Sequence, residues 1–182
     1  MNKRLLALVS IVIVLSGCAT SARIDKPKTA VQAEGMFPLT RNIQVYDVAG
    51  GSRKNYLQLS VIDRGDFKQA LRDALAESEF LAVDSSGKYS LRAKIVEVIQ
   101  PPSGVDISVT SVVQYTLVRE SDGRDFLDER ISASHSTDLD RTHTVGERVQ
   151  SAQTGSAKRN IEKLIFKLNE VNQKLIASPM PE

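Results

Sequence analysis

The sequence has 182 residues, one cysteine, no tryptophan and a formal net charge of +2 at pH 7. A single cysteine excludes a disulfide within the chain, and a chain of this length buries enough surface to fold without one. Lys3 and Arg4 lie in a segment that we expect to be removed, and without them the 22 remaining basic residues equal the 22 acidic residues in number. This balance argues against nucleic acid as a partner, because phosphate binding requires a basic excess or a basic face.

Residues 1–17 have the pattern of an export signal. A basic start that ends at Arg4 precedes an apolar run from Leu5 to Leu15, and small residues follow the run. The run is much shorter than the roughly 20 apolar residues of a membrane-spanning helix. A buried N-terminal helix is the alternative, but it explains neither the charge asymmetry nor the small residues at the end.

The only cysteine follows this segment directly. Leu15-Ser16-Gly17-Cys18 resembles the lipobox of bacterial lipoproteins, in which leucine, a small residue and glycine or alanine precede cysteine. The resemblance implies a diacylglyceryl group on the Cys18 sulfur, cleavage before Cys18 and acylation of the new amine. The membrane would then be a partner through acyl chains on Cys18, each buried methylene contributing about 0.8 kcal/mol. A secreted protein with an unpaired cysteine is the alternative.

The residue after the cysteine indicates which membrane would hold the protein. In the sorting rule of enterobacterial lipoproteins, aspartate at this place retains a lipoprotein in the inner membrane. The residue here is Ala19. The resemblance therefore implies the outer membrane, with the protein facing the periplasm.

Residues 18–41 are polar, contain Pro27 and Pro38 and show no sustained periodicity. They predict a lipidated N-terminus followed by a flexible tether with a reach of about 25 Å. An ordered arm is the alternative, with Met36, Phe37 and Leu39 packing against the domain at its end.

The next segment predicts a strand followed by a helix. Residues 42–48 alternate between apolar and polar side chains, and Gly50-Gly51 ends the pattern. Asp63 or Asp66 is placed to cap a helix that runs to about Ser78. One apolar stripe of this helix consists of Phe67, Ala70, Leu71, Ala74 and Leu75. A short extended piece follows at residues 80–83.

Three strands and a long helix complete the pattern. Strands are predicted at residues 88–100, where Val96 and Val98 shift the alternation, at 106–119 and at 125–136. A hairpin turn with Asp122-Gly123 joins the last two strands. An apolar stripe from Val145 to Leu175 predicts the final helix, which Gly155 could kink or split.

This order of elements predicts an α+β fold with one domain at residues 42–176 and a disordered tail at 177–182. Consecutive strands with short connections form an antiparallel meander. One mostly antiparallel four-stranded sheet with both helices on one face would bury each apolar stripe once, in the order β-α-β-β-β-α. The expected fold is therefore a two-layer sandwich.

The domain also resembles small lipoproteins of the bacterial envelope, although less specifically than the lipobox does. The lipopolysaccharide-assembly lipoprotein family and the auxiliary lipoproteins of ABC transporters have a similar order of elements. The residues that carry the resemblance are Phe80, Val83, Ser86, Gly87, Lys88, Tyr89, Leu91 and Ala93. The resemblance lies in the order of elements more than in specific motifs, and it transfers no partner-binding residue to this chain.

One segment could hold a metal ion. His135, Asp138, Asp140 and His143 place two imidazoles and two carboxylates within nine residues, which are ligand types that zinc uses. Their spacing matches no established zinc motif, and aspartates also suit a turn or a helix cap. We therefore favour a polar connector and predict no metal and no cofactor.

The sequence indicates no catalytic residue. It lacks a Gly-x-Ser-x-Gly motif, and Cys18 would be acylated. The adjacent carboxylates Asp128 and Glu129 should point to opposite faces of a strand. We therefore predict a non-catalytic accessory or scaffold in an envelope assembly or transport complex, with a protein partner of unknown identity. The alternative is a carrier for a periplasmic lipid or glycolipid, which would require a pocket between the sheet and the helices.

Overall fold

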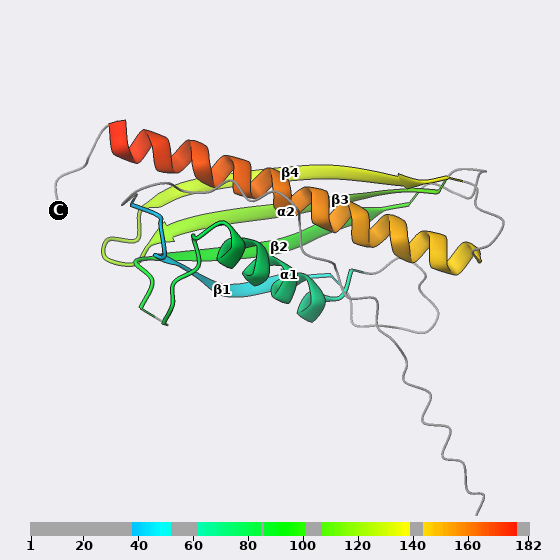
Figure 1. Cartoon of the computed structure of the whole chain (residues 1–182), viewed down its shortest axis with the longest axis horizontal. Helices are drawn as coiled ribbons and strands as arrows, with labels where there is room; N and C mark the ends of the chain where they lie inside the picture. Colours follow the sequence, from blue (N-terminus) through cyan, green and yellow to red (C-terminus); the bar gives the residue numbers. More distant parts are fainter. Residues whose placement is uncertain (1–37, 52–61, 85, 101–106, 139–143, 178–182) are drawn as a thin grey trace, which may run out of the picture.

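The computed structural model describes residues 38–51, 62–84, 86–100, 107–138 and 144–177, and the predicted signal segment, Cys18 and most of the predicted tether lie outside these ranges (Figure 1). The described residues form four strands and two helices, namely β1 (Ile43–Gly50), α1 (Arg64–Glu77), β2 (Tyr89–Ile99), β3 (Ile107–Arg119), β4 (Asp125–Thr137) and α2 (Val145–Ala177).

The strands form one sheet in the order β1-β2-β3-β4. Strand β1 is parallel to β2, whereas β2, β3 and β4 are joined as an antiparallel meander. Both helices lie on the same side of the sheet (Figure 1). The predicted two-layer α+β sandwich and the predicted order of its elements are thus confirmed.

Helix α1 begins with a side-chain cap. The Oδ1 atom of Asp63 accepts hydrogen bonds from the backbone N–H groups of Gly65 at 2.8 Å and Asp66 at 3.0 Å, and these bonds satisfy donors that have no partner inside the helix. Of the two predicted caps, Asp63 is the one used. The five apolar residues of the predicted stripe are all buried.

The alternation in β3 sorts its side chains between the two faces of the sheet. Ile107, Val109, Ser111, Val113, Tyr115 and Leu117 are buried beneath the helices. The pairing of β2 with β3 shifts register between Ile95 and Glu97, as the predicted change of phase at Val96 requires. The β3–β4 turn contains Gly123 with a φ of +69°, a conformation that glycine adopts without strain.

Helix α2 is continuous through Gly155, so the helix is not split at this residue. Its first turn is fixed by a capping box. The Thr144 hydroxyl accepts from the N–H of Glu147 at 3.3 Å, and the Glu147 carboxylate accepts from the N–H of Thr144 at 2.7 Å. With 33 residues, the helix is about 50 Å long and crosses the whole sheet (Figure 1).

The core has a large and a small part. The large cluster lies between both helices and the sheet and includes the fully buried Phe67, Tyr115 and Ile161. The small cluster lies under the N-terminal part of α2 and consists of Ile107, Val109, Val149 and Ala152. The first turn of α2 is therefore held by less apolar contact than its middle.

The chain enters the domain beside α2. Leu39 is completely buried, and its N–H donates to Oδ1 of Asn172 at 3.0 Å. This is the packing expected for the end of an ordered arm. The residues that precede Pro38 lie outside the described ranges.

Candidate functional site

Helix α2 follows strand β4 along most of its length, and we call this contact the α2–β4 seam. Its members on α2 are Arg148, Gly155, Arg159, Lys163 and Lys167, and their contacts on β4 are Thr137, His135, Ser134, Ser132 and Glu129. The two series run in opposite directions along the sequence. A single helix thus contacts the edge strand from one end to the other.

Two basic side chains of the seam bind backbone carbonyl groups of β4. Arg159 donates from Nη1 to the carbonyl oxygen of Ser134 at 2.8 Å, and Lys163 donates from Nζ to that of Ser132 at 2.7 Å. Carbonyl groups two residues apart in a strand point in the same direction, and within the described residues β4 pairs with a strand on one side only. The two cations therefore cover the free edge of the sheet, which would otherwise be open to pairing with another strand.

His135 lies next to these cations, under Gly155. A Cβ atom at Gly155 would overlap the imidazole ring and lie 2.6 Å from Nε2. The Nδ1 atom is buried and has no hydrogen-bond partner in the described part of the chain. Burial lowers the pKa of His135, and the positive charge of Arg159 lowers it further.

Asn160 forms a buried polar network beneath the seam. Its Nδ2 donates to the carbonyl oxygens of Ser111 at 3.0 Å and Ile131 at 2.9 Å, and its Oδ1 accepts from the Tyr115 hydroxyl at 2.9 Å. Burial raises the pKa of Tyr115 well above its usual value, so this hydroxyl stays protonated and donates. The network fixes α2 in one position over β3 and β4.

The structure describes only part of the predicted polar segment. His135 faces α2, and the carbonyl oxygen of Asp138 accepts from Nε of Arg148 at 3.1 Å. Asp140 and His143 lie outside the described ranges. Among the residues that are described, no group of three or more His, Cys, Asp or Glu side chains could hold a metal ion.

The two adjacent carboxylates of β4 have separate roles, as the alternation of a strand predicts. Asp128 accepts from Gln114 at 2.6 Å and from Thr116 at 3.3 Å. Glu129 instead pairs with Lys167 of α2 at 3.4 Å. They face opposite sides of the sheet and do not act together.

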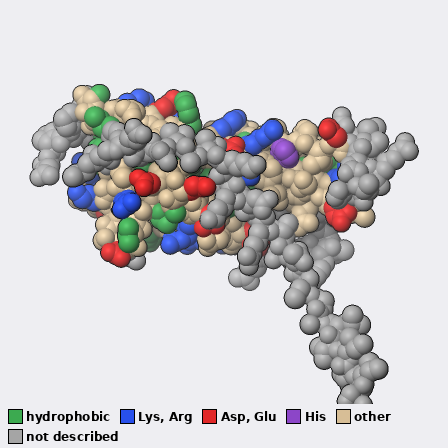
Figure 2. Space-filling view, in the orientation of Figure 1, with side chains coloured by type: hydrophobic (Ala, Val, Ile, Leu, Met, Phe, Trp, Pro, Cys, Tyr) green, Lys and Arg blue, Asp and Glu red, His purple; other side chains and the backbone are tan. Residues whose placement is uncertain are grey.

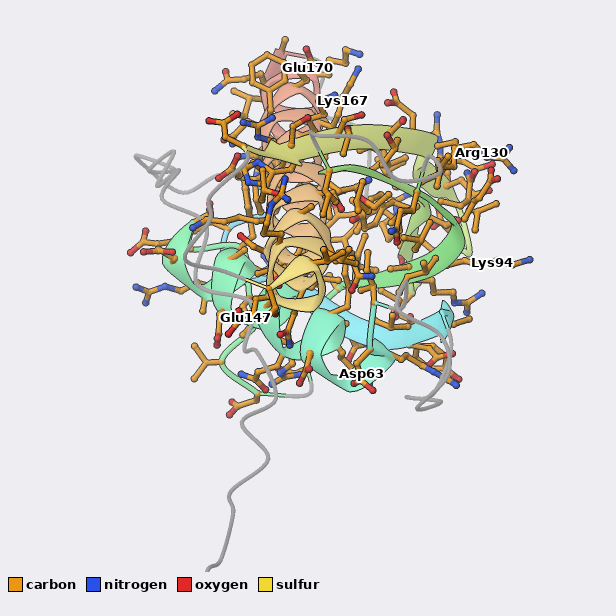
Figure 3. All side chains as sticks on the ribbon, turned by 90° about the vertical axis from the view of Figure 1, so that its right-hand side faces the viewer. Asp63, Lys94, Arg130, Glu147, Lys167 and Glu170 are labelled. Atoms are coloured by element: carbon orange, nitrogen blue, oxygen red, sulfur yellow. The ribbon has the colours of Figure 1, made fainter. Side chains whose placement is uncertain are left out.

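The outer face of the sheet, away from the helices, carries charges of both signs. The register places Lys94, Gln114 and Arg130 in one row across three strands, and Figure 3 shows Lys94 and Arg130 pointing away from α2. Asp128 lies in the next row, beside Arg92 and Thr116. This face is polar and mixed in charge.

A surface hollow of about 530 Å³ lies beside the start of β1. Its lining combines charged and apolar side chains and consists of Gln44, Val45, Arg72, Leu81, Ala82, Val83 and Asp84. The hollow is therefore separate from the space between the sheet and the helices, which Phe67, Tyr115 and Ile161 occupy.

Comparison with known proteins shows a shared fold. No family model matches the sequence, and no curated protein matches it. Among solved structures, protein XCC0632 of Xanthomonas campestris, assigned to the DUF330 family, superposes with a TM-score of 0.60 and 13% identity over 85% of this chain and 99% of that one. A candidate lipoprotein of Caulobacter crescentus superposes with a TM-score of 0.51 and 16% identity, and the match covers 78% of this chain and 96% of that one. The hypothetical protein CT253 of Chlamydia trachomatis superposes with a TM-score of 0.53 and 11% identity, and the match covers 69% of this chain and 94% of that one.

These identities show a common fold rather than a common function. Within the described ranges, neither helix is both long enough and apolar enough to cross a membrane. The seam and the Asn160 network were not predicted from the sequence. Asn160 and Asn172 do, however, fall on the apolar side of α2, between Ile161, Leu168 and similar residues, and an amide at such a position is a signal of a buried hydrogen bond.

Proposed function

We propose that the protein is a lipoprotein of the bacterial envelope, anchored through Cys18, that acts without catalysis as an accessory or scaffold in an assembly or transport complex. The anchor rests on Leu15-Ser16-Gly17-Cys18, which follows an export-type segment. The fold adds support, because the chain superposes on a candidate lipoprotein with a TM-score of 0.51. Outer-membrane attachment facing the periplasm is the placement that Ala19 favours.

The packed interior supports the accessory role over the carrier role. A lipid carrier needs an apolar pocket that buries most of its ligand. Side chains such as Phe67, Leu71 and Tyr115, each completely buried, fill the space between the layers of the sandwich. The hollow beside the start of β1 lies at the surface and is lined partly by Arg72 and Asp84. Such a charged lining suits an acyl chain poorly.

The single observation that carries the non-catalytic role is the use of the polar side chains in the seam and core. Asn160, Arg159 and Lys163 donate to backbone carbonyls, and Glu129 pairs with Lys167. These contacts hold the helix on the sheet. They do not converge on a position where a substrate atom could react.

The experiment is cross-linking in intact cells of the native host, followed by purification of the protein and mass spectrometry of its partners. The wild type should yield a reproducible envelope protein. A Cys18→Ser variant, which cannot be acylated, should lose that partner together with its membrane attachment. An unchanged partner in the unanchored variant would contradict the need for the anchor, and recovery of co-purified lipid without a protein partner would favour the carrier.

A further inference from the structure

We propose that the exposed side of the α2–β4 seam is the docking surface for a partner, and that this partner presents an extended acidic segment. The inference rests on the proposed accessory role and specifies where the partner binds. It starts from a stripe on α2 formed by Arg159, Lys163 and Phe166.

The three residues lie on one side of the helix because they are spaced at i, i+4 and i+7. Arg159 and Lys163 are exposed. Phe166 is 59% exposed although it is a large apolar side chain. Exposed aromatic side chains next to arginine are typical of residues that dominate protein interfaces.

Among the described residues, the two cations of the stripe have no acidic partner. Each is held by a backbone carbonyl group, through one donor only, and neither forms an ion pair among the described residues. Arg159 therefore retains four N–H donors and Lys163 two for a ligand. Glu162 lies on the flank of the stripe.

Basic residues outnumber acidic residues on the N-terminal side of the stripe. Strand β3 contains no Asp or Glu, none occurs in β4 between Glu129 and Asp138, and none occurs in α2 between Glu147 and Glu162. The same region contains Lys158 and Arg159, and the acidic residues Glu129 and Glu170 lie beyond the other end of the stripe, where both pair with Lys167. Figure 2 shows basic side chains gathered beside the purple histidine on the face that carries the helices. This surface is therefore complementary to an anionic partner.

The spacing of the cations favours an extended peptide. The carbonyl groups of Ser132 and Ser134 are two strand residues apart, which is about 7 Å. Because these carbonyls hold Lys163 and Arg159, the two charged groups have a similar spacing. Acidic side chains at alternate positions of an extended segment have the same separation, and an apolar residue further along that segment would reach Phe166.

The test measures binding of a fluorescent peptide of alternating glutamate and valine to the full-length protein in neutral detergent. A peptide with the same composition but contiguous glutamates serves as the peptide control. The seam variant is Arg159→Gln with Lys163→Gln, because glutamine retains a donor for the β4 carbonyls while it removes the charge. The matched control is Lys94→Gln with Arg130→Gln, which removes the same charge from the outer face of the sheet.

We expect salt-sensitive binding of the alternating peptide that weakens about ten-fold in the seam variant and is unchanged in the matched control. Phe166→Ala should also weaken it. Equal weakening in both double variants, or equal binding of both peptides, would overturn the proposal. A second measurement compares binding to phosphatidylglycerol vesicles with binding to phosphatidylcholine vesicles. If the seam variant lost its preference for phosphatidylglycerol vesicles but bound the peptide as well as the wild type does, the surface would contact the membrane and the proposal would be overturned.

A photo-cross-linking residue placed in cells at position 166 or at position 94 separates this inference from the proposed function. Capture of an envelope protein from position 166, lost in the seam variant, supports both. Capture from position 94 alone overturns the seam as the docking surface and leaves the accessory role intact. Capture from neither position overturns the seam as the docking surface, and the accessory role is then contradicted only if the cross-linking of the wild type described above also yields no envelope protein.

Discussion

The Cα atom of Gly155 in α2 lies against the imidazole ring of His135 in β4, so that no side chain fits between the helix and the strand at this point. From the sequence alone, Gly155 is a position at which the helix could kink or split. The structure shows that it permits the close approach of two elements while α2 continues through it. Several properties of the protein follow from this contact.

Replacing Gly155 by alanine should destabilise the protein although alanine is the better helix former. The added Cβ must displace the His135 ring or the helix, and overpacking of this kind costs about 1–3 kcal/mol. Urea unfolding measures the loss. Gly146→Ala in the same helix is the matched control, because its Cβ would come no closer than 3.9 Å to the nearest atom, and it should be neutral or stabilising by up to about 1 kcal/mol.

The contact itself can be tested with a second substitution. His135→Ala makes room at Gly155, so Gly155→Ala should cost much less in that background. Additive effects of the two substitutions would show that the ring and the glycine do not constrain each other.

The stability of the protein should fall as the pH drops through the range in which an exposed histidine titrates. Burial, and then Arg159, lower the pKa of His135 in the folded state, so the unfolded chain binds the proton more readily. The free energy of unfolding is therefore unaffected well above 6.5, the usual pKa of histidine, and it decreases below that pH. A comparison of urea unfolding at neutral and acidic pH measures this decrease, and His135→Leu should reduce it. An equal pH dependence in wild type and variant would assign the effect to other groups.

Removing the buried amide of Asn160 should be among the most damaging single changes. Asn160→Ala leaves the Tyr115 hydroxyl and the Ile131 carbonyl without this partner, at about 1–3 kcal/mol for each buried group. Asn169→Ala is a control on the same helix, because among the described residues the Asn169 side chain donates only to Ile165 of its own helix. This substitution should cost less than about 0.5 kcal/mol. Thermal unfolding of both variants gives the comparison.

Removing the cations that cover β4 should promote self-association. Arg159→Ala with Lys163→Ala exposes the carbonyl groups of Ser134 and Ser132, and an uncovered edge strand is a template for pairing. Analytical ultracentrifugation should therefore detect larger species than for the wild type. Lys94→Ala with Arg130→Ala, on the outer face of the sheet, should not change the mass distribution.

The fold was largely predictable because its signals are local. The alternation in β3, the stripe of α1 and the Asp122-Gly123 turn each predict an element from neighbouring residues. The parallel pairing of β1 with β2 was not predicted, because it joins residues more than 40 positions apart and leaves no periodic trace in either segment. The burial of Leu39 was one of the alternatives, but its hydrogen bond with Asn172, 133 positions further along the chain, was not predicted for the same reason.

The candidate site was less predictable than the fold. His135 was noted for its imidazole, but the sequence gave no indication that Gly155 would lie against it, since that contact depends on how α2 sits on β4. Arg159 and Lys163 read as ordinary residues of a helix surface. Only the tertiary arrangement reveals that they bind the edge of the sheet.

The central claim is the attachment of the domain to a membrane through Cys18, and the most direct measurement is the intact mass of the protein extracted from membranes of its native host. We predict a chain that lacks residues 1–17 and carries the mass of acyl groups on Cys18. A chain that retains the first 17 residues, or one that begins at Cys18 with an unmodified thiol, would contradict the account.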